Sequence, residues 1–161
     1  MSETRKTTPK KGFSLPDTDH VMRHVPSSRL RRDENDNIIG FLPQAFELRP
    51  GEKSLSVNWL EFFDGDHNVR IKKAIHDLRA AKKIGTKSAF GLGRVDNIKT
   101  ICGKSQTTVK IVYAPTKDNY SHSEIRRIPR DNLSLLEALA TEAFVDLVRN
   151  VDIEEIKKHS E

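Results

Sequence analysis

Two segments of the chain place apolar residues at the spacing of one helical face, and this feature restricts the fold more than any other in the sequence. The first segment is residues 68–84, and the second is residues 134–150. Residues 20–25 and 55–60 instead alternate apolar and polar side chains, as half-buried strands do. The sequence therefore predicts an α+β fold in which a mostly antiparallel sheet carries two packed helices.

Local signals set the expected ends of the two helices. Asp66 or Asn68 is suited to cap the start of the first helix, and Gly85 is placed to end it. Ser134 and Glu137 have capping-box spacing at the start of the second helix, whose apolar stripe continues to Val148.

Turn-forming residues divide the rest of the chain into extended segments. Residues 29–40 are expected to form a polar loop, followed by a short strand at 45–48 and a turn at Pro50-Gly51. Three further extended segments are expected, at residues 89–101, 107–113 and 122–128. The loop at 103–106 predicts that the first two of these form a hairpin, and Gly91 and Gly93 indicate a bulge or a close backbone approach.

A length of 161 residues corresponds to one domain. Residues 1–15 have no pattern that would bury a face and are expected to form a disordered basic tail. Residues 16–150 are expected to form a single α+β domain, and residues 151–161 a C-terminal tail or a short helix.

The sequence favours a cytoplasmic protein. No run approaches the roughly 20 apolar residues of a membrane span, and the N-terminus lacks the apolar core of a secretory signal. The single cysteine, Cys102, cannot form an intramolecular disulfide and is expected to be a buried structural thiol.

The net charge of +5 favours contact with a polyanion. The basic tail and the outer face of the first helix, a stripe about 24 Å long at 1.5 Å per residue, are expected to follow several phosphates. The expected nucleic-acid-binding residues are Arg5, Lys6, Lys10, Lys11, Arg70, Lys72, Lys73, Arg79, Lys82 and Lys83.

His20, Arg23 and His24 form the densest polar cluster on an expected strand. They suit a phosphate- or nucleotide-binding site or acid–base catalysis, and the alternative is that they are exposed polar residues of an edge strand. On a regular strand Arg23 points away from the two histidines, so all three line one pocket only if the strand is bent.

His122 and Glu124 share one face of the last expected strand and suit a catalytic pair, although a cross-strand ion pair by Glu124 is the alternative. If the protein is an enzyme, residues of the first strand must converge with Ser56 or Asn58 and with His122 or Glu124 around one pocket.

Two other patterns are assigned no ligand. The turn Asp64-Gly65-Asp66-His67-Asn68 contains metal-ligating residue types, but helix capping explains them and no metal site is predicted. The run Gly91-Leu92-Gly93-Arg94 lacks the third glycine of a dinucleotide fingerprint. The sequence thus points to no particular cofactor.

Four short motifs follow one another along the chain: Arg23-His24-Val25-Pro26, Ala45-Phe46, Leu55-Ser56-Val57 and Ser121-His122-Ser123-Glu124-Ile125. With these motifs the chain resembles, over residues 19–145, a loose family of small bacterial proteins to which no activity is assigned. A fainter resemblance is to the ADP-ribosyltransferase fold, carried by Arg23 or His20, by Ser54-Leu55-Ser56 and by Glu124 in that order. This second resemblance implies an NAD-directed activity, although the chain has no clear aromatic motif that would stack on NAD.

The favoured interpretation is a small basic binding protein for nucleic acid or another phosphate-rich partner. One alternative is a small enzyme centred on His and Arg that acts on a nucleotide or a nucleic acid, either by ADP-ribosyl transfer or at a phosphodiester. A protein–protein adaptor is the other.

Overall fold

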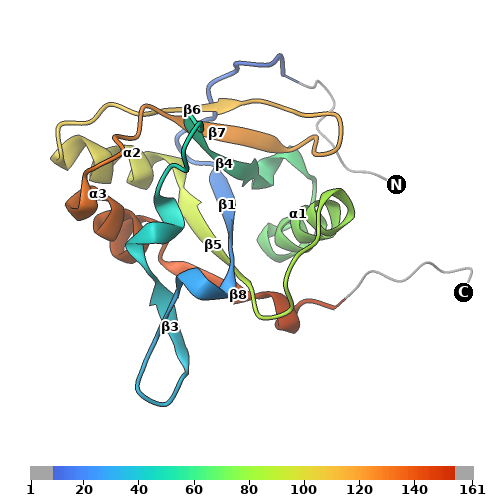
Figure 1. Cartoon of the computed structure of the whole chain (residues 1–161). Helices are drawn as coiled ribbons and strands as arrows, with labels where there is room; N and C mark the ends of the chain where they lie inside the picture. Colours follow the sequence, from blue (N-terminus) through green and yellow to red (C-terminus); the bar gives the residue numbers. More distant parts are fainter. Residues whose placement is uncertain (1–8, 155–161) are drawn as a thin grey trace, which may run out of the picture.

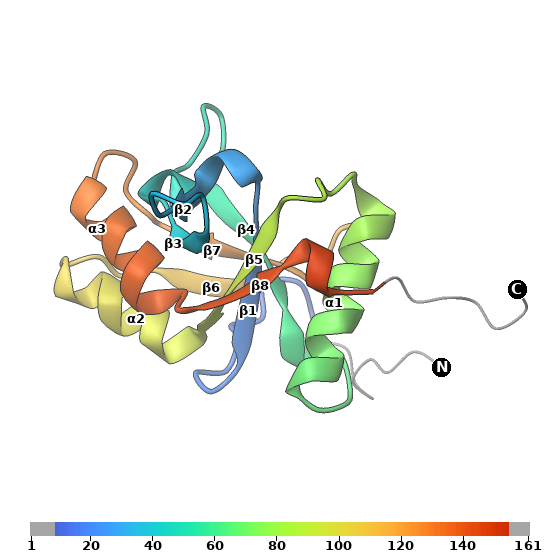
Figure 2. The same ribbon diagram turned by 90° about the horizontal axis from the view of Figure 1, so that it is seen from below.

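The computed structural model describes residues 9–154 and has three layers, with a six-stranded sheet between helices (Figures 1 and 2). The strand order is β6-β7-β4-β1-β5-β8, and every pairing is antiparallel. The strands of this sheet are β1 His20–Val25, β4 Ser54–Trp59, β5 Ala89–Arg94, β6 Lys110–Tyr113, β7 His122–Arg126 and β8 Asp146–Arg149. The predicted α+β class is confirmed.

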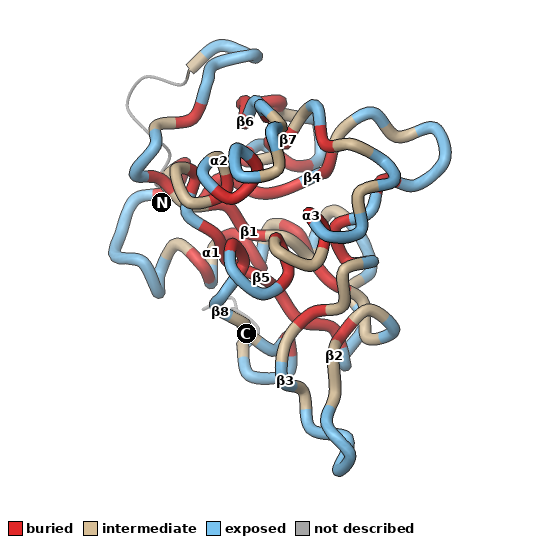
Figure 3. The backbone as a smooth tube through the Cα atoms, turned by 90° about the vertical axis from the view of Figure 1, so that its left-hand side faces the viewer, coloured by how far each residue is buried: buried red, intermediate tan, exposed pale blue. Residues whose placement is uncertain are grey.

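Helix α1, His67–Ala81, covers one face of the sheet, and α2, Val95–Lys104, and α3, Leu133–Ala138, cover the other (Figure 2). Apart from the sheet, β2 Leu30–Arg32 and β3 Ile38–Phe41 form a hairpin that projects from the body with an exposed tip (Figure 3). Within residues 9–154, no helix is long and apolar enough to cross a membrane.

Helix α1 forms where the apolar spacing predicts it. The Asp66 carboxylate accepts a hydrogen bond of 2.9 Å from the Val69 N–H and so caps the helix. The helix buries Ile71, Ala74, Ile75 and Leu78 against the sheet. It ends at Ala81, before the predicted stop at Gly85.

The expected strand at 89–101 is wrong beyond Arg94, where the chain turns into α2. The amide of Val95 donates to the Asp19 carbonyl, and the amide of Asp96 donates to the Asp17 carbonyl. These bonds satisfy amides that a helix start leaves free. The buried residues Val95, Ile98, Ile101 and Cys102 then lie on one helical face, so the predicted hairpin across 103–106 does not form.

The second predicted helix is shorter than its apolar stripe. The Asn132 side chain, rather than Ser134, caps α3. The helix continues through a π-helical turn, Leu139–Ala143, and stops where Phe144 leaves helical backbone geometry and packs on Phe46. The last apolar residues, Leu147 and Val148, belong instead to β8, which pairs with β5 at the sheet edge.

Three shorter segments also differ from expectation. The predicted strand at 45–48 is the 3-10 turn Pro43–Phe46, which begins at a proline that fits helical geometry. The predicted loop at 29–40 is mostly the β2–β3 hairpin, whose tip holds Asp36 at a φ of 66°. Two more 3-10 turns, Ser27–Arg29 and Leu60–Phe62, follow β1 and β4, and a third, Asn150–Asp152, follows β8.

The folded part begins earlier than residue 16. The amide of Gly12 donates to the Tyr113 carbonyl, and Ser14 bridges to Val112 at the edge of β6. Leu15 is buried in the core. The predicted tail therefore ends before Gly12, because main-chain hydrogen bonds to an open strand edge order a segment that has no apolar period of its own. Arg5 and Lys6 lie outside the described residues.

The glycines of β5 confirm the predicted close approach. A Cβ at Gly91 would lie 3.0 Å from the Phe41 ring, and one at Gly93 would lie 3.1 Å from the Ala143 carbonyl oxygen. The π-helical turn and the β2–β3 hairpin therefore pack directly on the strand backbone.

Candidate anion-binding cavity

The candidate site lies where β1 and β4 stop pairing. The two strands pair only at Val21 with Trp59 and at Met22 with Asn58. Beyond this point β1 continues beside β5, while β4 continues beside β7 as far as Ser54 opposite Arg126. The sheet therefore opens between β1 and β4.

A cavity of about 350 Å³ occupies this opening, a size that suits a small ligand. Side chains from both faces of the sheet reach it: Ala45 from one side, and Leu78 and Lys82 from the end of α1 on the other. This opening explains how Arg23 and His24, which are neighbours on β1, both line one cavity. The lining residues are Arg23, His24, Pro26, Arg29, Ala45, Arg49, Glu52, Ser56, Asn58, Leu78, Lys82, Asn119 and His122.

Arg23 bridges the opening. Its Nε donates to the Ala45 carbonyl at 2.7 Å, and its Nη1 donates to the Ser56 carbonyl at 2.9 Å. Burial, together with the nearby Arg49 and Arg29, lowers the pKa of Arg23 to about 10, although Glu52 opposes the shift. Arg23 remains a cation near neutral pH and holds the two halves of the sheet at a set separation.

His24 lies against the ring of Phe90, with the ring centroids 5.6 Å apart. Burial lowers its pKa to about 4, and the charges of Lys82, Arg23 and Arg49 add to this effect. The imidazole is therefore neutral at pH 7. Its Nε2 is buried and has no hydrogen-bond partner, which is uncommon for a buried polar atom.

Arg49 and Glu52 stand on the turn that Pro50-Gly51 makes, where Gly51 adopts a φ of 86°. The Glu52 carboxylate accepts a 2.7 Å hydrogen bond from the amide of Arg49. Arg130, beyond β7, donates to the main-chain carbonyls of both Arg49 and Glu52. This clamp holds a short surface loop beside the cavity.

The charges of the lining are unbalanced. Four cationic side chains face one carboxylate, which gives a formal charge of +3 when all five are ionised. Lys82 follows the last turn of α1, where its pKa is lowered by burial and then by Arg23 and Arg49. The like charges thus repel one another at the cavity, and a bound anion would relieve that repulsion.

His122 connects the cavity to Ser56 through two hydrogen bonds. Its Nδ1 lies 2.7 Å from the Ala114 carbonyl oxygen, and its Nε2 lies 3.1 Å from the Ser56 Oγ. A carbonyl oxygen only accepts, so Nδ1 carries the proton and Nε2 presents a lone pair to the serine hydroxyl. The Ser56 side chain is exposed to the cavity.

Buried amides and a hydroxyl build the wall beside His122. The Asn58 Nδ2 donates to the Asn119 Oδ1 and to the Ser121 Oγ, both at 2.7 Å. The amide of His122 in turn donates to the Asn119 carbonyl at 3.2 Å. This network ties the 116–121 loop to β4 and so positions the imidazole.

The convergence expected of an enzyme holds for Arg23, His24, Ser56, Asn58 and His122, which all line the cavity. Strand β4 separates β1 from β7, so the two strands are not direct neighbours. Residues of β1, β4 and β7 nevertheless line the same cavity.

Two predicted catalytic residues lie elsewhere. The His20 Nδ1 contacts the Glu61 carboxylate at 2.6 Å, and its ring lies 4.9 Å from that of His67, outside the cavity. Glu124 pairs with Arg126 of its own strand at 3.0 Å, an ion pair within the strand rather than the expected cross-strand pair.

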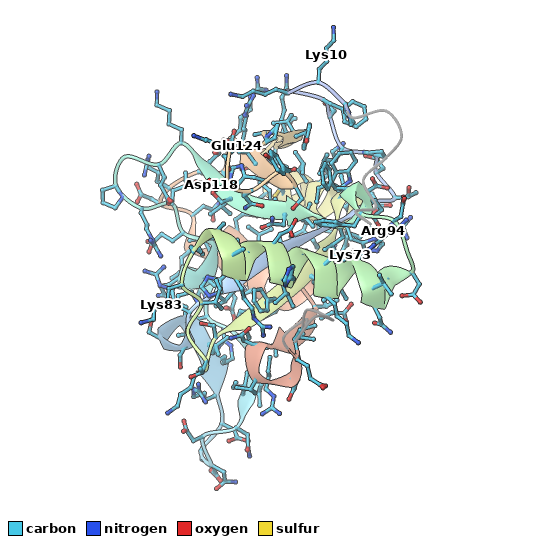
Figure 4. All side chains as sticks on the ribbon, turned by 90° about the vertical axis from the view of Figure 1, so that its right-hand side faces the viewer. Lys10, Lys73, Lys83, Arg94, Asp118 and Glu124 are labelled. Carbon is cyan, nitrogen blue, oxygen red and sulfur yellow. The ribbon has the colours of Figure 1, made fainter. Side chains whose placement is uncertain are left out.

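The predicted basic surface divides into separate parts. Lys73 stands on α1 and Lys83 lies two residues past its end, whereas Lys10 projects from the N-terminal segment at the top of the view (Figure 4). Arg70 donates to the Phe63 carbonyl and Arg79 to the carbonyls of Asn150 and Ile153, so these two arginines tie α1 to its neighbours. Lys72, Lys82 and Lys83 are all exposed, and Lys82, directly after α1, also lines the cavity.

Three charged residues of the cavity, Arg29, Arg49 and Glu52, were missed from the sequence. Arg49 and Glu52 flank the predicted Pro50-Gly51 turn, and charged residues beside a tight turn next to a strand are the signal that would have marked them. Arg29 donates to the Gln44 carbonyl, and no local sequence pattern indicates this contact.

The described residues contain no group of three or more His, Cys, Asp or Glu side chains arranged to hold a metal ion. Cys102 is a buried free thiol, and burial raises its pKa to about 11. It takes no part in the cavity.

Comparison of the chain with protein-family models, curated proteins and solved structures finds no match to any of the three. The two sequence resemblances therefore stay predictions, and the functional argument depends on the cavity itself.

Proposed function

We propose that this protein binds the phosphate groups of a nucleotide, either free or within a nucleic-acid strand, in the cavity between β1 and β4. The observation that carries the proposal is the lining charge: four cationic side chains share a cavity with a single carboxylate. Guanidinium and ammonium groups are the usual protein ligands of phosphate.

The chemistry of the cavity suits a phosphate oxygen in detail. Arg23 uses its Nε and Nη1 on main-chain carbonyls, which fixes the guanidinium plane at the opening. The amides around Asn58 and Asn119 suit recognition of a sugar or base.

The proposal replaces the extended basic stripe of α1 with a concave site as the centre of recognition. A nucleic-acid strand would reach the same phosphate-binding groups through Lys82 and Lys83 at the end of α1. The proposed location is the cytoplasm, where the protein would meet both free nucleotides and nucleic-acid strands.

Isothermal titration calorimetry with ADP, pyrophosphate and a short single-stranded oligonucleotide tests the proposal. R49Q and K82Q each remove one cavity charge, and we expect each to weaken ADP binding by about tenfold, the loss of one charged hydrogen bond. The matched control is K72Q, which removes a charge of the same kind from the exposed side of α1 and is expected to leave ADP binding unchanged.

The ligands distinguish the two sources of phosphate. Tight ADP binding with a weak, strongly salt-dependent oligonucleotide signal indicates a free nucleotide, and the reverse order indicates a strand. The proposal fails if none of the three compounds binds, or if K72Q weakens ADP binding as much as K82Q does.

A further inference from the structure

A serine hydroxyl and a histidine stand together in the cationic cavity. The Ser56 Oγ lies 3.1 Å from the His122 Nε2, and the other ring nitrogen is held 2.7 Å from the Ala114 carbonyl oxygen. This is the order of a nucleophile, a general base and a group that orients the base.

The fold presents the pair for reaction. Ser56 is exposed to the cavity although the residues on either side of it, Leu55 and Val57, are buried in the core. His122 is fixed from both ends, because its amide bonds to the Asn119 carbonyl and its own carbonyl accepts from the Ala114 amide at 3.0 Å. Rotation of the imidazole would break its hydrogen bond to the Ala114 carbonyl, so this bond holds the ring toward Ser56.

The charges around the serine suit one substrate class. The Arg23 guanidinium contacts the main-chain oxygen of Ser56 at 2.9 Å, and Arg49, Arg29 and Lys82 line the same cavity. Cations at this position would stabilise the negative charge that a phosphoryl group spreads over its oxygens when it is transferred.

We propose that Ser56 is a catalytic nucleophile, with His122 as its general base, that cleaves a phosphate ester bound in the cavity. This inference rests on the proposed phosphate-binding function and adds a reaction to it. It also gives the enzyme interpretation a specific chemistry, which Ser56 and His122 carry out.

The reaction has two balanced steps. The Ser56 Oγ forms a bond to phosphorus while the bond from phosphorus to the ester oxygen breaks, and His122 takes the serine proton and delivers it to the leaving oxygen. Water then attacks the phosphoserine, the bond between phosphorus and Oγ breaks, and His122 passes the proton of water to the serine oxygen. Phosphorus keeps its oxidation state, and water is the only co-reactant.

Labelling with diisopropyl fluorophosphate tests the nucleophile without requiring a natural substrate. We expect Ser56 to form a bond to phosphorus with loss of fluoride, a product that intact-mass and peptide mass spectrometry locate. S56A is expected to lose the label, and H122N to label at least about 100-fold more slowly, the usual range for loss of a general base. S54A is the matched control on the same strand and is expected to label as the wild type does.

Hydrolysis of p-nitrophenyl phosphate and bis(p-nitrophenyl) phosphate provides the second measurement. We expect the wild type to release p-nitrophenolate from at least one of them and S56A to release none, while S56A still binds ADP in calorimetry. Thermal melting and circular dichroism confirm that S56A, H122N and S54A are folded.

The outcomes separate the two proposals. ADP binding without labelling of Ser56 overturns the nucleophile inference alone, as does equal labelling of H122N and the wild type. Labelling of Ser56 when neither ADP, pyrophosphate nor the oligonucleotide binds supports the serine and histidine pair but overturns the proposed phosphate-binding function.

Discussion

The Arg23 Nη1 donates a 2.9 Å hydrogen bond to the Ser56 carbonyl across the opening between β1 and β4. This carbonyl lies beyond the last paired residues of the two strands, Met22 and Asn58. The arginine side chain thus supplies the hydrogen-bond donor that β1 does not supply to the Ser56 carbonyl. It also brings a positive charge into the cavity.

Replacement of Arg23 by lysine is expected to destabilise the protein although it keeps the charge. A lysine cannot present two donors in one plane to the carbonyls of Ala45 and Ser56, so at least one half-buried carbonyl loses its partner. We expect R23K to lower the free energy of unfolding by about 1–3 kcal/mol, measured by urea denaturation. R94K, at an exposed arginine on the neighbouring strand, is the control, and an equal effect of both variants would contradict a bridging role for Arg23.

The stability of the protein is expected to fall in mild acid because of His24. Folding lowers the pKa of His24 from 6.5 to about 4, so the unfolded chain binds the extra proton between these two values. The free energy of unfolding therefore decreases as the pH falls from about 6.5 to about 4, by at most about 3 kcal/mol from this residue. Urea denaturation across that range measures the decrease.

H24Q is expected to remove this part of the acid sensitivity, because glutamine does not titrate. H76Q is the control, since His76 is exposed on α1 and outside the cavity. If the wild type and H24Q lose stability in parallel between pH 6.5 and pH 4, His24 is not the group that titrates.

Alanine is expected to have opposite effects at two glycines. A Cβ at Gly93 would lie 3.1 Å from the main-chain oxygen of Ala143 and 3.2 Å from the side chains of Ile98 and Phe144, so several neighbours would have to move and we expect G93A to cost about 1–3 kcal/mol. A Cβ at Gly103 in α2 meets nothing within 4 Å, so G103A is expected to add about 0.5–1 kcal/mol through helix propensity. Thermal melting of both variants measures the difference, and stabilisation by G93A would show that the π-helical turn does not pack on β5.

The thiol of Cys102 is expected to be unreactive in the native protein. It is buried in α2, and its pKa is raised to about 11, so little thiolate forms at pH 8. We expect no reaction with Ellman's reagent in buffer and complete reaction of the one thiol in guanidinium chloride. Rapid reaction in buffer would mean that α2 opens readily.

Local patterns predicted the elements whose period and ends are both clear. Strands β1 and β4 and helix α1 follow from alternation, from helical spacing and from the Asp66 cap. Helix α2 was missed although Val95, Ile98 and Ile101 recur at helical spacing, because its ten residues directly continue the extended segment that begins at Ala89. Hydrogen bonds from its first amides to Asp17 and Asp19, far away in sequence, fix the point where the strand ends and the helix begins.

The apolar stripe of residues 135–148 led to the wrong prediction of one long helix. Leu147 and Val148 continue the helical spacing of residues 135–144, yet the open edge of β5 takes them as a strand. Pairing with an existing strand edge gives hydrogen bonds that a helix would also give, so the choice rests on packing.

The sequence by itself determined where α1 and the strands β1, β4 and β7 form, which side chains alternate along them, and that the single thiol belongs to the core. These properties depend on residues close together in the chain. Only the tertiary structure decided that Arg23, His24, Ser56 and His122 meet while His20 and Glu124 do not. That outcome depends on the strand order β7-β4-β1 and on the place where β1 and β4 part, and both are set by pairing between residues far apart in the chain, which no local pattern specifies.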